Sequence, residues 1–134
     1  MSVTKKFVLT CMRSLLRIPD SIQSSGTINR IIIAEFGFDE NVVTITWNLL
    51  DENNFIPAKS NVKHLLWFLA YSKTYGPLEV YCSRFGTCKV TLTKHINEMS
   101  RSVTALKAKI ASRKKIYKYF MFNFLIKTNF LFFR

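Results

Sequence analysis

The chain has 134 residues, of which 49% are hydrophobic, and a formal net charge of +12. This length limits it to one domain, and its three cysteines are too few and too irregularly spaced for a disulfide-stapled secreted scaffold. Reduced thiols in an intracellular protein are therefore expected. Residues 1–83 carry eight basic and seven acidic side chains, whereas residues 84–134 carry twelve basic side chains and only Glu98. Such a basic block attracts phosphate or an anionic membrane surface, or is simply a solvated tail.

Residues 1–26 are predicted to be an irregular N-terminal segment, because Ser21, Ser24, Ser25 and Gly26 form a loop signal. The first 19 residues are basic and free of acid, which is also a property of organelle transit peptides. The apolar run over residues 7–12 is too short for a secretory signal.

Three helices are expected in the next part of the chain. The first covers residues 27–36, although its three consecutive isoleucines would also suit a strand, and Gly37 ends it. Asp39 is placed to cap a second helix that runs to Leu50. The third covers about residues 60–73, with one apolar stripe at helical spacing: Val62, Leu65, Leu66 and Leu69.

A short helix over residues 78–85, begun by Pro77, and a long helix from about 88 to 110 are predicted next. The long helix has an apolar stripe made of Leu92, Ile96, Met99, Val103, Leu106 and Ile110. Its opposite face carries Thr93, Lys94, Asn97 and Arg101. This pattern favours a helix that docks on a core and presents its polar face to DNA.

The segment joining these two helices has the spacing of a helix-turn-helix. Cys82 supplies a small residue where the helices cross, and Gly86, four residues later, supplies the turn. The second helix then begins with hydroxyl and basic groups suited to the major groove: Lys89, Thr91, Thr93 and Lys94. Thr87 and His95 depart from the pattern, since aliphatic residues are usual there. The competing interpretation is an ordinary helix pair in a bundle, with His95 at the edge of its core.

Three stretches resemble the N-terminal region of Harbinger-type DDE transposases: residues 63–70 (KHLLWFLA), 75–76 (YG) and 85–94 (FGTCKVTLTK). That region has a helix of pattern LL..L.YLATG, a short SLA..FG helix and a recognition helix of the S.STVS type. Residues 36–42 (FGFDENV) and 47–50 (WNLL) are similar to the preceding FGVS.EV...LW..L pattern of some members. The resemblance covers about residues 29–107.

The resemblance implies an all-α DNA-binding region followed by a nuclease domain in which three carboxylates hold two metal ions. No Asp or Glu follows Glu98, so no catalytic residue carries over, and the chain is expected to be truncated and not an enzyme. Neither a zinc pattern nor a glycine-rich phosphate loop is present, and no cofactor or metal is predicted.

The last segment, residues 111–134, is a basic and aromatic tail, irregular or helical, with three open interpretations. It forms phosphate contacts, it anchors a membrane-associated protein through residues 116–133, or it is translated noncoding sequence in a relic reading frame without selected function. Lys118 and Lys127 count against a membrane span.

The overall prediction is an all-α small helical bundle with its DNA-binding domain over residues 27–110, in a nuclear protein whose partner is duplex DNA. The alternative is a membrane-associated location. The predicted DNA contacts are Lys89, Thr91, Thr93, Lys94, Asn97, Arg101 and Lys107. Further phosphate contacts are expected from Lys109, Arg113, Lys114, Lys115 and Lys118. The oligomeric state is not predicted.

Overall fold

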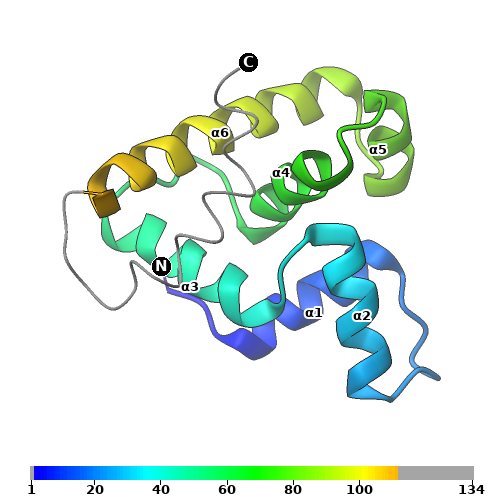
Figure 1. Cartoon of the computed structure of the whole chain (residues 1–134). Coiled ribbons are helices and arrows are strands. Elements are labelled where there is room, and N and C mark those ends of the chain that lie inside the picture. The colour runs from blue at the N-terminus through cyan, green and yellow to red at the C-terminus, as the bar shows by residue number, and fades with distance from the viewer. Residues whose placement is uncertain (1, 112–134) are drawn as a thin grey trace.

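The computed structural model describes residues 2–111, and all of the regular secondary structure in this part of the chain is helical (Figure 1). The prediction of an all-α bundle is therefore confirmed, with six helices in the described residues. They are α1 (Lys5–Leu16), α2 (Ser25–Phe36), α3 (Glu40–Glu52), α4 (Val62–Thr74), α5 (Leu78–Phe85) and α6 (Lys89–Ala111). The predicted tail, with the phosphate contacts from Arg113 to Lys118 and the membrane anchor over 116–133, lies outside the described residues.

Helix α4 is the centre of the core, because it packs against α1, α2, α5 and α6 (Figure 1). Its sequence is almost continuously apolar, and every residue from His64 to Ala70 is buried. Such a helix gains most of its stability by burying apolar area on all sides rather than on one stripe. The predicted stripe of α4 is confirmed, but it understates how much of this helix is covered.

The N-terminal segment is the main error in the predicted fold. Residues 5–16 form α1, whose N-cap Thr4 accepts a hydrogen bond from the Phe7 N–H, and Val8 and Met12 are fully buried. The backbone of Val3 is also tied to α3, since its N–H donates to Asn48 Oδ1 at 2.8 Å and its carbonyl accepts from Asn48 Nδ2 at 3.1 Å. Because α1 packs on α3 and α4, it belongs to the same core, and a domain boundary at residue 26 is wrong.

Local signals place the ends of the middle helices. Gly37 ends α2 in the left-handed region at φ 84°, where glycine has no Cβ penalty, and the Asp39 side chain accepts from the Val42 N–H at 3.1 Å to cap α3. The three isoleucines of α2 are helical, with Ile32 fully buried and Ile33 exposed. Both predicted helix ends are thereby confirmed.

The turn between α4 and α5 is held by a buried tyrosine. The hydroxyl of Tyr81 accepts a hydrogen bond from the Gly76 N–H at 3.0 Å and also contacts the Thr74 hydroxyl. Its ring packs edge-on against Tyr71 of α4. These contacts set the position of α5, and through it the start of α6.

Candidate nucleic-acid interface

Helices α5 and α6 are joined by a tight turn at the predicted position. Gly86 adopts φ 67°, and the N–H groups of Gly86 and Thr87 both point to the carbonyl of Cys82. A left-handed residue at this place favours glycine, because other side chains are strained there. The helix pair and its glycine turn are therefore present, while DNA recognition by the pair stays a prediction.

One side of α6 is buried along its described length. Leu92, Met99, Val103 and Leu106 are fully buried, and Ile96 nearly so. Ser102 adds a polar link, since its hydroxyl lies 2.6 Å from the carbonyl oxygen of Phe55 in the connection between α3 and α4. This anchoring fixes which side of α6 faces outward.

The outward side of α6 is a continuous stripe of exposed residues, which we call the α6 stripe. Its members follow one another at intervals of three or four residues: Val90, Lys94, Asn97, Arg101, Thr104 and Ala108. From Val90 to Arg101 the stripe is roughly 16 Å long at the rise of an α-helix. A helix side of this length, with cationic and amide groups along it, fits the major groove of B-DNA.

Six of the seven predicted contact residues divide into two groups. Lys94, Asn97 and Arg101 are exposed and lie on the α6 stripe as predicted. Thr91, Thr93 and Lys107 are only partly exposed, because successive helical residues are rotated by about 100° and these three fall on its flanks. Thr93, predicted to share the polar side with Lys94, Asn97 and Arg101, lies at its margin and is partly exposed.

Lys89, the seventh predicted contact, is exposed but has a partner. Its ammonium group lies 3.2 Å from a carboxylate oxygen of Glu79 in α5, and both side chains are mostly exposed. An ion pair at such a surface contributes little to stability. The structure therefore leaves Lys89 able to exchange this carboxylate for a phosphate at small cost.

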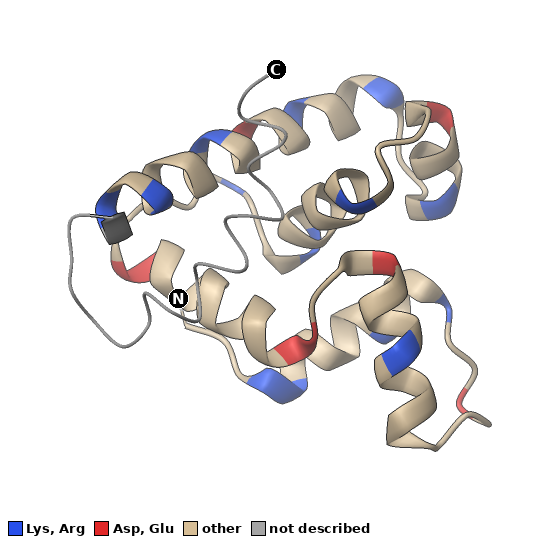
Figure 2. Cartoon of the chain, viewed as in Figure 1, with Lys and Arg blue, Asp and Glu red and all other residues tan. Residues whose placement is uncertain are grey.

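The charge of α6 differs from that of the rest of the described chain. It carries five basic residues and one acidic residue, whereas the other seven acidic residues lie elsewhere in residues 2–88 (Figure 2). A second ion pair, Arg84 with Glu35, joins α5 to α2. The excess of positive charge is thus concentrated on the helix that also carries the α6 stripe.

Sequence reasoning missed Val90, which is 80% exposed and the most exposed large apolar side chain of the described residues. It lies in the first turn of α6 on the α6 stripe, four residues before Lys94, so the helical spacing that predicts Lys94 and Arg101 on this side also predicts Val90 there. An apolar group at this place is suited to the methyl group of thymine.

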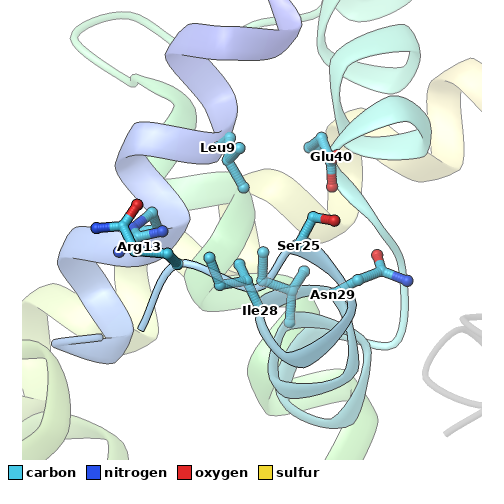
Figure 3. A pocket seen from close by; sticks show the side chains of 8 residues that line it. Leu9, Arg13, Ser25, Ile28, Asn29 and Glu40 are labelled. Atoms are coloured by element: carbon cyan, nitrogen blue, oxygen red, sulfur yellow. The ribbon is translucent and has the colours of Figure 1, made fainter. Parts of the chain in front are cut away.

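The described chain also has a hollow of about 270 Å³ between α1, α2 and the start of α3 (Figure 3). Leu9, Ile28 and Ile32 supply apolar walls, and Glu40 and Arg13 lie at its polar rim. The Arg13 guanidinium already donates to the carbonyls of Pro19 and Ile22, each at 3.3 Å. This cation therefore holds the segment between α1 and α2.

Within residues 2–111, no three His, Cys, Asp or Glu side chains are gathered closely enough to hold a metal ion. None of the described helices is both long and apolar enough to cross a membrane. Neither a protein-family model, nor a curated protein, nor a solved structure matches this chain.

Cys88 and Cys11 are expected to differ in reactivity. The Thr91 hydroxyl, 3.1 Å from the Cys88 sulfur, lowers the pKa of this exposed thiol, whereas burial raises the pKa of the Cys11 thiol. Since the thiolate is the nucleophile, iodoacetamide at neutral pH should modify Cys88 severalfold faster than Cys11. Mass spectrometry of a time course measures both rates. Thr91→Val should slow Cys88 only; equal rates in the parent chain would contradict the prediction.

Proposed function

We propose that the helical domain binds duplex DNA by placing the α6 stripe in the major groove, with α5 and the turn at Gly86 positioning it. The observation that carries the proposal is the α6 stripe itself: Lys94, Asn97 and Arg101 are exposed in line on a helix whose other side is buried. Lysine and arginine bind phosphate or guanine, and asparagine binds adenine edges.

The proposal includes a role of the kind found in the DNA-binding region of Harbinger-type transposases, acting in the nucleus. Two things support it: the sequence resemblance over residues 29–107, and the positions of α4, α5 and α6, which coincide with the three helical motifs of that resemblance. The target sequence in such a role would be a terminal repeat of the mobile element. The protein would bind this DNA without cleaving it.

A fluorescence anisotropy titration with a labelled 20-base-pair duplex tests the proposal. Binding should be detectable at low salt and should weaken steeply between 50 and 200 mM salt, because each phosphate contact releases a counterion. About six contacts would give a log–log slope near −5. Absence of binding at low salt would overturn the proposal.

The ion pair between Glu79 and Lys89 offers a variant that should raise the affinity for the duplex. Glu79→Gln removes the carboxylate that pairs with Lys89 and one negative charge beside the proposed interface. The affinity for the duplex should rise severalfold at low salt, because Lys89 can then bind a DNA phosphate without first leaving the Glu79 carboxylate. The matched control is Asp20→Asn between α1 and α2, which removes the same charge from an exposed position away from α5 and α6.

A further inference from the structure

The described chain brings its two histidines face to face, although 30 residues separate them in the sequence. His64 lies in the first turn of α4 and His95 in α6, and their rings stack with centroids 3.6 Å apart and an angle of 4° between the planes. The Trp67 ring lies nearly perpendicular to both, at 77° to His64 and 73° to His95. We call this contact the histidine stack; it joins α6 to the central helix.

The hydrogen bonding of His64 favours its neutral form. His64 Nδ1 accepts a hydrogen bond from the Asn61 N–H at 3.0 Å, and Asn61 Oδ1 in turn accepts from the Lys63 N–H. A proton on His64 Nδ1 would face the Asn61 N–H and remove half of this helix cap. His95 Nδ1 is buried without a hydrogen-bond partner, 4.0 Å from a carboxylate oxygen of Glu98.

The charges around the histidine stack are mixed. Lys63 of α4 and Lys94 of α6 disfavour protonation of the rings, whereas Glu98 of α6 favours it at His95. Burial, with the neighbouring His95 and Lys63, lowers the pKa of His64 to about 4, and burial also lowers that of His95. Two protonated rings at this separation would repel each other and cannot stay stacked in a buried place.

We propose that the histidine stack is a proton-sensitive contact that holds α6 on α4 while both rings are neutral and releases it when they are protonated. The Asn61 cap and the stacking geometry carry this inference independently of any ligand. If α6 is the DNA-binding helix, as proposed above, acidification will weaken DNA binding. This is opposite to the usual effect of added positive charge on DNA affinity.

Acid should destabilise the fold, because the pKa of His64 is lower in the folded chain than in the unfolded chain. The unfolded chain binds protons on histidine near pH 6.5, and the folded chain binds one on His64 only near pH 4. The contribution of His64 to the free energy of unfolding is therefore fully present above about pH 6.5 and is lost as the pH falls toward 4. Between pH 7 and pH 5, His64 alone should increase the unfolding equilibrium constant roughly twentyfold. The chain has no other histidine to obscure the effect.

Proton NMR of the full chain gives the first test, by following both imidazole Cε1–H signals from pH 7.5 to 4.5. Both should stay near their neutral positions until the folded chain begins to unfold. A midpoint close to 6.5 for either histidine in the folded chain would overturn the proposal, and this measurement needs no variant.

Urea unfolding at pH 7 and pH 5 gives the second test. His64→Gln keeps an acceptor for the Asn61 N–H without a titratable ring, and His95→Phe keeps a flat ring that takes no proton. The double variant should lose most of the roughly twentyfold pH effect. An unchanged pH effect in the double variant would overturn the proposal.

Anisotropy with the 20-base-pair duplex at pH 7 and pH 4, where about half of His64 is protonated in the folded chain, completes the design. The parent chain should bind more weakly at pH 4, and the double variant should lose less affinity. An equal loss of affinity in the two chains at pH 4, or none in the parent chain, would contradict the link between the stack and α6. If no duplex binds at either pH, the proposed function fails, while the NMR and unfolding tests still decide the histidine stack.

Discussion

Replacement of Lys94 and Arg101 together by alanine is expected to lower the affinity for duplex DNA about ten- to hundredfold at low salt. Both side chains are exposed on the α6 stripe, two turns apart on one side of the helix. Each cation contributes one phosphate contact or a bidentate contact to guanine. The salt slope should become less steep by about 2, which anisotropy at several salt concentrations measures directly.

The matched control is the replacement of Lys5 and Lys6 by alanine in α1. Both lysines are also exposed. Their replacement removes the same net charge, but from a helix that does not contact α5 or α6 closely. The control should change the affinity less than threefold, because long-range attraction is screened within about 10 Å at 0.1 M salt. Equal losses for the two pairs would show that net charge, and not the α6 stripe, drives binding.

Met12→Ala should destabilise the domain by about 2–5 kcal/mol, a large share of the stability of a protein of this size. Met12 is fully buried on α1, where it belongs to the common core, and its truncation leaves a cavity that the surrounding helices fill only in part. Urea unfolding followed by circular dichroism gives the free energy of unfolding and the midpoint.

Phe7→Ala, five positions earlier on the same helix, is the comparison. Phe7 is 50% exposed, so removal of a larger side chain should cost under about 1 kcal/mol. If Met12→Ala is no more destabilising than Phe7→Ala, α1 is not docked on the core in solution. A loss confined to the Met12 variant would support its assignment to the domain.

The helix ends were predictable because their causes are local. Gly37 and Gly86 each adopt a left-handed conformation, and the Asp39 side chain bonds to an N–H three residues away. Helix α1 was also within reach, because Val8, Met12 and Leu15 recur at helical spacing. The loop signal of the serine-rich residues 21–26 applies only to the connection after α1, and not to residues 5–16.

The candidate interface was predictable only in part. The apolar stripe from Leu92 to Leu106 decides which side of α6 is buried, and the opposite side follows from helical geometry. Helical spacing predicted the exposed positions of Lys94, Asn97 and Arg101, and Thr93 lies at the margin of the same side. The ion pair that occupies Lys89 was out of reach, since it depends on how α5 crosses the start of α6.

By itself, the sequence determined that the described chain is helical, where most of its helices end, and which side of α6 is polar. These properties depend on periodicity and capping over a few residues. Only the tertiary structure decided that α1 shares the core, that Lys89 pairs with Glu79, and that His64 stacks on His95. Each of these needs the relative placement of separate helices, which packing of buried side chains sets and no local pattern records.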